Sequence, residues 1–151
     1  MRRMTPRLLV LSLICALGTA TAGCGSKGGA DKFVGSWIYA GAIDPNCQNI
    51  AAVDLTGDAV TITATDSSHL QVDLAGYCNI AFEVDGFTAS ASGGQSCTFD
   101  IPSLGPQAIA ITSWTLMMTG DDVLTSDFRG AILICAPTGT GTLTRQADAG
   151  G

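Results

Sequence analysis

Apolar and polar residues alternate with a period of two along much of the chain. The alternation is clearest at residues 60–65, 70–74, 80–84 and 109–118. Successive side chains of a β-strand point to opposite faces of a sheet, so this period is typical of strands with one buried face. No apolar period of 3.6 residues persists for more than about two helical turns. The pattern therefore predicts an all-β chain.

Short segments rich in glycine and small polar residues separate the apolar runs. They lie at residues 66–68, 85–86, 93–95, 119–122 and 137–139. The Asp-Gly pair at 85–86 is a hairpin signal, because it tolerates the positive φ angles of a tight turn. We expect about eight to ten strands in an antiparallel up-and-down meander. Such a meander closes as a β-barrel or folds as a β-sandwich.

The first 23 residues have a different character. Arginines come first, then a short apolar run at residues 8–17, and then only small residues at 18–23. A positive start, an apolar core and a small-residue cleavage zone are the three parts of a secretory signal. A transmembrane helix needs about 20 apolar residues, which this run does not provide. Residues 1–23 are therefore predicted to be a cleaved signal peptide.

Two cleavage sites overlap at the end of this segment. Residues 20–22 (Ala-Thr-Ala) fit the small-x-small site of ordinary secretion, which would release a soluble secreted or periplasmic protein. Residues 21–24 (Thr-Ala-Gly-Cys) resemble the lipobox of bacterial lipoproteins, although Thr21 stands where that family usually has Leu. The resemblance implies that Cys24 is lipidated and anchors the chain to a membrane. In that family, an Asp directly after the lipidated Cys keeps the protein at the inner membrane. This chain has Gly25 at that position, so the resemblance implies the outer membrane.

The number of cysteines agrees with lipidation of Cys24. Of six cysteines, Cys15 leaves with the signal, and lipidation occupies Cys24. The four that remain are Cys47, Cys78, Cys97 and Cys135. An even number of cysteines in an exported domain predicts two disulfides. Ordinary secretion would instead leave five cysteines, one of them unpaired.

Four cysteines allow three pairings. Our hypothesis pairs Cys78 with Cys97, across two neighbouring strands, and Cys47 with Cys135. The second bond would tie the loop after the first strand to the entry of the last strand. It would thereby join the two ends of the domain.

The mature chain is long enough for one domain. We expect a lipidated Cys and a flexible Gly/Ser tether at residues 24–32, a β-barrel domain at 33–146 and a disordered tail at 147–151. Three of the seven basic residues lie in the signal and all thirteen acidic residues lie after it, so four basic and thirteen acidic residues give the mature chain a net charge of −9. Phosphate contacts need Lys and Arg, so nucleic-acid binding is excluded.

One sequence pattern resembles a known family. Residues 33–37 (Phe-Val-Gly-Ser-Trp) resemble the Gly-x-Trp start of lipocalins and related calycin barrels. The resemblance implies that Trp37 is crossed by a late arginine, here Arg145, at the closed end of the barrel. The chain is also similar to small exported lipoproteins of myxobacteria, which share the Gly-Gln-x-Cys at 94–97 and the Gly-x-Leu-x-Arg at 141–145.

His69 is the only histidine, so any Ser/His/Asp triad must use it. As a functional residue it would be a general base or a metal ligand, but no Cys or His at ligand spacing surrounds it. No Gly-x-Ser-x-Gly nucleophile motif is present either. We favour a solvated turn residue.

Two acidic pairs complete the candidates for chemistry. Glu83 and Asp85 share one strand face and could act as an acid/base pair or bind calcium, and Asp121 and Asp122 lie in a turn. No Asp-x-Asp-x-Asp-Gly loop is found, so solvated surface is favoured. A dinucleotide site requires its Gly-x-Gly-x-x-Gly motif to follow a strand directly, and the one at 23–28 does not. We therefore expect no catalysis, no metal and no cofactor.

The remaining functional expectation is binding. The apolar residues of the alternating faces line either a packed core, which we favour, or a cavity for a small hydrophobic ligand. They include Phe82, Phe87, Phe99, Ile109, Ile111, Leu133 and either Met117 or Met118. We expect an outer-membrane lipoprotein that binds such a ligand or serves as an envelope surface protein. The alternative is a structural or protein-interaction module with a filled core, whose protein partner the sequence does not identify.

Overall fold

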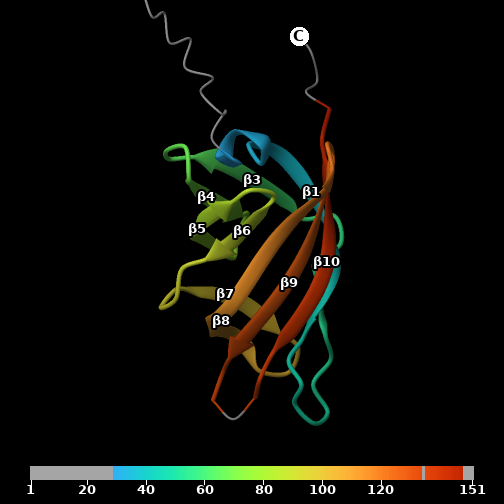
Figure 1. Ribbon diagram of the computed structural model, residues 1–151. Helices are drawn as coiled ribbons and strands as arrows, with labels where there is room; N and C mark the ends of the chain where they lie inside the picture. The colour runs from blue at the N-terminus through green and yellow to red at the C-terminus, as the bar shows by residue number, and fades with distance from the viewer. Residues whose placement is uncertain (1–28, 134, 148–151) are drawn as a thin grey trace, which may run out of the picture.

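β-Strands are the main element of the structure, a computed structural model that describes residues 29–133 and 135–147 (Figure 1). Over these residues the chain forms ten strands and one short 3₁₀ helix. In chain order they are η1 (Gly29–Lys32), β1 (Gly35–Asp44), β2 (Val53–Asp54), β3 (Ala59–Ala64), β4 (His69–Leu74), β5 (Cys78–Asp85), β6 (Thr88–Ala91), β7 (Ser96–Ile101), β8 (Gly105–Gly120), β9 (Val123–Ala131) and β10 (Thr138–Arg145). The prediction of an all-β chain is confirmed.

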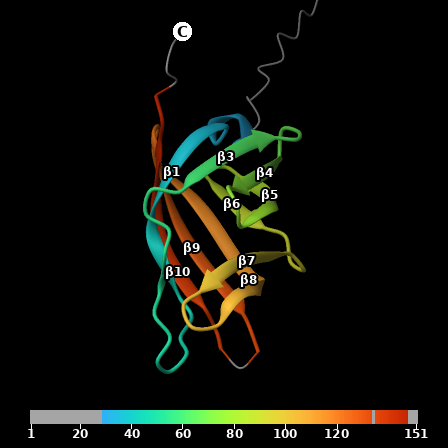
Figure 2. The same cartoon turned by 180° about the vertical axis from the view of Figure 1, so that it is seen from behind.

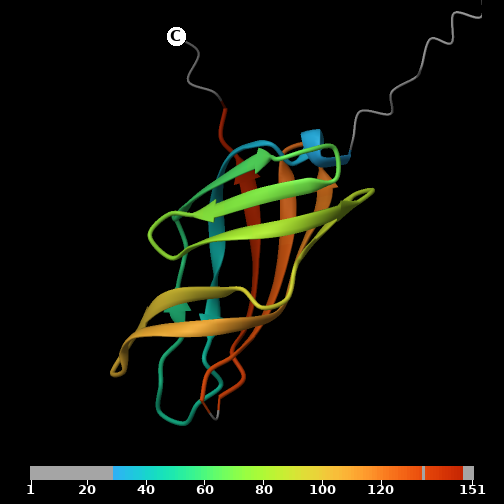
Figure 3. The same cartoon turned by 90° about the vertical axis from the view of Figure 1, so that its left-hand side faces the viewer.

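Eight of the strands close into an antiparallel barrel. Hydrogen bonds join β1 to β3, then β4, β5, β6, β8, β9 and β10 in turn, and β10 returns to β1. β2 extends the sheet beside the end of β1, and β7 pairs with the first part of β8. In Figure 3 this gold β7–β8 hairpin lies below the green strands β3 to β5. The predicted meander is a barrel and not a sandwich.

The period-two alternation determines which side chains fill the barrel. Leu70, Val72 and Leu74 of β4 are buried, whereas His69 and Asp73 on the same strand are exposed. Each fully buried apolar side chain of this size contributes about 1.5–3 kcal/mol. The alternation thus supplies both the local preference for strands and the driving force for closing the sheet.

The phase of the alternation changes once within β8. Two residues, rather than one, stand between the buried side chains of Ile111 and Trp114. The pairing with β9 passes from Ile111 directly to Ser113, which leaves Thr112 unopposed. An extra residue of this kind is a β-bulge, and it returns the following side chains to the inner face.

Aromatic side chains fill the interior beside β7, β8 and β9. Their rings form a continuous series: Tyr77 lies 5.0 Å from Phe99, Phe99 lies 6.3 Å from Phe128, Phe128 lies 5.6 Å from Trp114, and Trp114 lies 5.4 Å from Phe82. Each such pair contributes about 0.5–1.5 kcal/mol beyond the burial of its area. Of the residues expected to face inward, Phe82, Phe99, Ile109 and Ile111 are buried.

Two of the residues expected to face inward do not. Phe87 is 59% exposed because it belongs to the β5–β6 hairpin turn. Of the two methionines, Met118 packs against the core, and Met117 alternates with the buried Leu116 and is 48% exposed. Leu133 is 93% exposed at the tip of the connection between β9 and β10. The turn expected at residues 137–139 is also displaced: β10 already begins at Thr138, and the chain reverses between Ile132 and Cys135.

The barrel has two different ends. At the closed end lie η1, the β3–β4, β5–β6 and β8–β9 turns and both ends of the described chain (Figures 1 and 2). At the opposite end, here called the loop end, lie the β1–β2 loop, the β7–β8 turn and the β9–β10 connection. Within the described residues, no helix has the length and apolar character needed to cross a membrane.

Candidate functional site

At the closed end, Arg145 lies across the ring of Trp37. The guanidinium carbon is 4.2 Å from the ring centroid, close enough for a cation–π interaction of about 0.5–2 kcal/mol. The guanidinium also donates to the backbone oxygens of Val34 (2.5 Å) and Lys32 (2.8 Å), and its Nε lies 3.2 Å from a carboxylate oxygen of Asp122. The structure thus contains the Trp37–Arg145 contact that the calycin resemblance implies.

Glycine at position 35 makes room for this arginine. A Cβ atom built on Gly35 would lie 2.6 Å from Nη1 of Arg145, and its φ of 147° is one that other residues rarely adopt. The Gly-x-Trp pattern therefore has a physical reason in this chain. The glycines of β10 serve other side chains: Gly141 lies against Tyr39 and Gly139 against Ile43.

Both hypothesised disulfides are confirmed. Cys78–Cys97 joins the start of β5 to β7, and Cys47–Cys135 joins the β1–β2 loop to the β9–β10 connection. The second bond continues the pairing of β1 with β10 beyond its last pair, Asp44 and Thr138. It therefore closes the barrel covalently at the loop end, as Arg145 closes it non-covalently at the other end.

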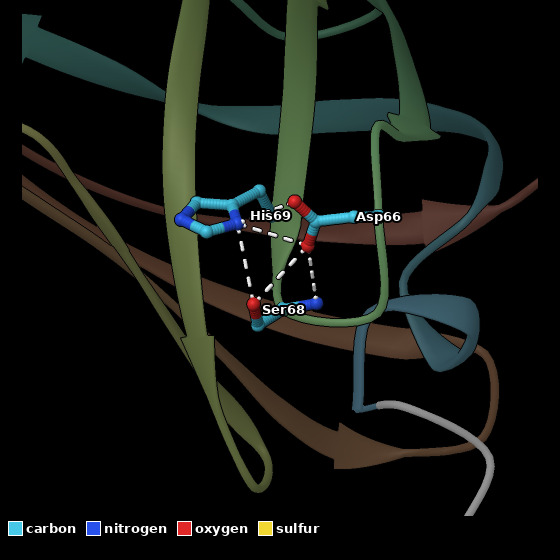
Figure 4. Close-up of polar contacts among 3 residues, drawn as sticks. All are labelled: Asp66, Ser68 and His69. Carbon is cyan, nitrogen blue, oxygen red and sulfur yellow. Dashed lines mark hydrogen bonds and ion pairs between the residues drawn. The ribbon is translucent and has the colours of Figure 1, made fainter.

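The Ser/His/Asp group does not have the geometry of a catalytic triad (Figure 4). Nδ1 of His69 lies 2.8 and 2.9 Å from the carboxylate oxygens of Asp66, and the Ser68 hydroxyl lies 3.2 Å from the same Nδ1. A triad needs the serine and the carboxylate on opposite nitrogens of the ring, so that the histidine can accept one proton while the other nitrogen is held. Here both groups share one nitrogen, and the side chains of His69 and Asp66 are exposed.

The contacts within this group have a local structural role. The backbone N–H and the hydroxyl of Ser68 both donate to the Asp66 carboxylate, at 2.8 and 3.1 Å. The backbone hydrogen bond from Ser68 and the side-chain hydrogen bond from His69 lower the pKa of Asp66 to about 2. Hydrogen bonds of this kind are typical of an Asx turn. They fix the β3–β4 turn at the closed end.

The two acidic pairs do not form a metal site. Glu83 and Asp85 both face solvent, beside a shallow hollow that also contacts Thr88 and Ser90. In the other pair, Asp122 is the ion-pair partner of Arg145. Over residues 29–133 and 135–147, no three His, Cys, Asp or Glu side chains are grouped so that they could hold a metal ion.

The loop end has a hollow that is mostly apolar. It measures about 450 Å³ and lies between the β1–β2 loop, the β7–β8 turn and the β9–β10 connection. Its lining consists of the Cys47–Cys135 disulfide and of Asn46, Gln48, Ile50, Leu104 and Leu133. Leu104 is 46% exposed and Leu133 is 93% exposed. We call this feature the loop-end hollow.

The backbone around the loop-end hollow adopts unfavourable conformations. Within the described part of the chain, the residues other than glycine with positive φ are Asn46 (54°), Asn49 (63°), Ser103 (73°) and Leu133 (47°). All four belong to the three loops of the loop end. Asn tolerates this conformation, but for Leu it costs about 1–2 kcal/mol. Strain of this kind tends to gather where a protein binds or reacts.

Several bonds hold these loops in place. Nδ2 of Asn46 donates to the backbone oxygen of Ala136 (2.7 Å) and to the hydroxyl of Thr138 (3.0 Å). The backbone N–H of Asn46 in turn donates to the carboxylate of Asp44 (2.8 Å). Together with the Cys47–Cys135 disulfide, these bonds join the β1–β2 loop to the β9–β10 connection.

Charge separates the two ends. Residues 45–52, 102–104 and 132–137, which form the connections at the loop end, include no Asp, Glu, Lys, Arg or His. The closed end, in contrast, carries Asp31, Lys32, Asp66, Asp85, Asp121 and Asp122. Sequence reasoning missed the loop-end hollow, although the uncharged stretches were a signal that could have pointed to it.

Other predictions concern residues outside the described ranges. The signal peptide at 1–23, the lipidation site Cys24 and residues 148–151 of the tail lie there. The last four residues of the expected tether, Gly29–Lys32, are described: they form η1, and Ala30 is buried. The described structure thus includes four residues that the prediction assigned to the tether.

Comparison with known proteins identifies no family for this chain. No protein-family model and no curated protein sequence matches the chain. The chain is similar to a redesigned β-barrel, at 16% sequence identity and a TM-score of 0.46 over 81% of this chain and 98% of that one. It is also similar to EF1p2_mFAP2b, solved bound to DFHBI, at 13% identity and a TM-score of 0.43 over 80% of this chain and 98% of that one. The resemblance to lipocalins and to exported lipoproteins remains a prediction.

Proposed function

We propose that this protein is a non-catalytic lipoprotein, anchored in the outer membrane through Cys24, whose barrel presents the loop end as a binding surface. The observation that carries the proposal is the placement of two features at opposite ends. The described chain begins at the closed end, where the segment from Cys24 enters, and the uncharged apolar loops lie at the other end.

The length of the tether supports this orientation. The link from Cys24 to Gly29 spans at most about 17 Å, at about 3.3–3.6 Å per residue. Strand β1, which runs from the closed end towards the loop end, has 10 residues and is about 33 Å long. A lipid on Cys24 would therefore hold the closed end near the bilayer, with the loop end directed away from it.

A role without catalysis is supported by the geometry of the polar groups. His69 is the only histidine, and its contacts with Asp66 and Ser68 share one ring nitrogen. The Arg145 guanidinium, which could otherwise bind an anion, is occupied by backbone oxygens and by Asp122.

A second candidate function is a structural or protein-interaction module. The continuous aromatic series from Tyr77 to Phe82 favours it, because these rings occupy interior volume that a ligand enclosed in the barrel would need. In that case the barrel is a rigid support, and a protein of the envelope is the partner. Both candidates place recognition outside the barrel.

The anchor is tested by mass spectrometry of the native protein purified from its host membranes. We expect a mature chain that begins at Cys24 and carries acyl chains, with the protein in the outer-membrane fraction. A Cys24→Ser variant should lose the added mass and leave that fraction. A mature chain that begins at Gly23 with a free Cys24 thiol would instead identify a secreted or periplasmic protein and contradict the proposal.

A further inference from the structure

We infer that the loop-end hollow binds a neutral, apolar small molecule, which contacts Leu104 and Leu133 from outside the barrel. This inference rests on the proposed use of the loop end for binding. It adds the chemical class of the ligand and the residues that contact it.

The absence of charge indicates a neutral ligand. No residue of the three connections at the loop end is charged, and the adjacent Asp44 carboxylate already accepts the backbone N–H of Asn46, so a charged ligand would lose water there without a free opposite charge on the lining. The chain keeps most of its charges elsewhere, including the charged side chains of the closed end. The side-chain amides of Asn46 and Gln48 are the polar groups beside the apolar lining, and such neutral groups can orient a ligand without selecting a charge.

The size of the hollow indicates a small molecule. Its volume of about 450 Å³ lies within the range of about 300–1,000 Å³ that is typical of small-molecule sites. A stable contact with a protein, including a second copy of this chain, needs about 800 Å² from each partner, contributed by about 20–30 residues. The lining of the loop-end hollow is far smaller than that. The anchoring bilayer is also excluded as the occupant, because the tether enters at the opposite end.

The hollow is also held in shape before a ligand arrives. The Cys47–Cys135 disulfide forms part of its wall, and the hydrogen bonds of Asn46 fix the loop beside it. A site that is already ordered loses little conformational entropy on binding. This matters for a shallow site, in which a ligand gains less buried area than it would in an enclosed one.

The test uses the full chain carrying Cys24→Ser, so that neither acyl chains nor detergent compete for the hollow. The neutral fluorescent probe N-phenyl-1-naphthylamine is titrated into the protein, and the anionic probe 8-anilinonaphthalene-1-sulfonate serves for comparison. We expect saturable binding of the neutral probe, one molecule per chain, and binding of the anionic probe that is weaker by about tenfold or more.

Two variants and a matched control locate the site. Leu133→Ser and Leu104→Ser should each weaken binding of the neutral probe, by about tenfold for Leu133. Phe87→Ser removes an apolar side chain that is 59% exposed at the closed end, and it should leave binding unchanged. Because the three side chains are exposed, the variants should keep the circular dichroism spectrum of the parent chain.

Three outcomes would overturn the inference. Probe binding that Leu133→Ser leaves unchanged, or that Phe87→Ser weakens equally, would show that the hollow is not the site. Sedimentation of the chain as a dimer that Leu133→Ser dissociates would show a second copy as the occupant. Leu133-dependent binding to phosphatidylethanolamine vesicles would show a lipid surface. The proposed anchor is tested on the native chain, so it can fail while this inference holds, and the reverse is also true.

Discussion

At the closed end of the barrel, a glycine supplies the positive φ angle beside Trp37, whereas at the loop end positive φ angles fall on Asn46, Asn49, Ser103 and Leu133 as well as on Gly105. Glycine adopts this conformation without steric cost, and a β-carbon makes it unfavourable. The closed end therefore uses the residue that suits its backbone. The loop end keeps side chains where stability alone would favour glycine.

The two ends also differ in the interactions that hold them. Polar bonds of Arg145 with backbone oxygens and with Asp122 hold the closed end, and a disulfide holds loops without charge at the loop end. Unfavourable backbone conformations tend to gather where a protein binds or reacts. The interactions of the closed end thus serve stability, whereas the loop end has the features of a candidate site.

The largest effect should come from removing the disulfide at the loop end. The Cys47–Cys135 bond closes a loop with a sequence separation of 88, and the Cys78–Cys97 bond closes one of 19. Loop entropy then predicts losses of about 4–5 kcal/mol for Cys47→Ala with Cys135→Ala, and of about 3 kcal/mol for Cys78→Ala with Cys97→Ala. Urea unfolding of the two double variants measures both values.

The comparison between the two double variants serves as the control. If removing Cys78–Cys97 cost more stability than removing Cys47–Cys135, the loop end would depend less on its covalent bond than the loop lengths predict. The neutral-probe titration should separate them further, because only the Cys47–Cys135 bond forms part of the hollow.

The next effect concerns the closed end. Arg145→Ala removes the contact with Trp37 and leaves the backbone oxygens of Val34 and Lys32 without this donor, so we expect a loss of about 2–3 kcal/mol in urea unfolding. Arg145→Lys should recover only part of it, because one ammonium group cannot replace the planar donor array. Full recovery by lysine would mean that charge alone, through Asp122, closes this end.

The sequence predicted the closed end better than the loop end, for physical reasons. Alternation reports burial along a strand, and the contact of Trp37 with Arg145 came with a short recognisable pattern. Alternation says little about turns, where a side chain such as Phe87 or Leu133 follows a strand without continuing its face. It also cannot show the β-bulge at Thr112, which depends on the pairing with β9.

The loop-end hollow was beyond sequence reasoning because its parts are far apart in the chain. Ile50, Leu104 and Leu133 belong to three separate connections, which only the closed barrel brings together. The hypothesised cysteine pairing did predict that the β1–β2 loop meets the entry of the last strand. It could not show that Leu133, which we expected in the core because it is hydrophobic, would lie exposed in the β9–β10 connection.

A smaller effect, of opposite sign, should follow from changing Leu133. Leu133→Asn places a residue that tolerates positive φ at 47°, and the lost side chain was 93% exposed. We expect a gain of about 0.5–1 kcal/mol in unfolding free energy, together with weaker binding of the neutral probe. Gly35→Ala at the closed end is the contrasting change, and it should destabilise the chain. A loss of stability in Leu133→Asn would mean that the leucine is structural.

The smallest effect is a dependence of the β3–β4 turn at the closed end on pH. Hydrogen bonds from Ser68 and His69 lower the pKa of Asp66 to about 2, below its ordinary value of 3.8, so the unfolded chain binds this proton more readily than the folded one. The stabilisation by Asp66 is therefore complete above about pH 4 and is lost as the pH falls towards 2. Amide hydrogen exchange should show the β3–β4 turn opening in this range, whereas the loop-end connections, which the Cys47–Cys135 disulfide joins, keep their protection. Asp66→Asn should remove the pH dependence at the turn, and equal opening of both ends in acid would contradict the contrast between them.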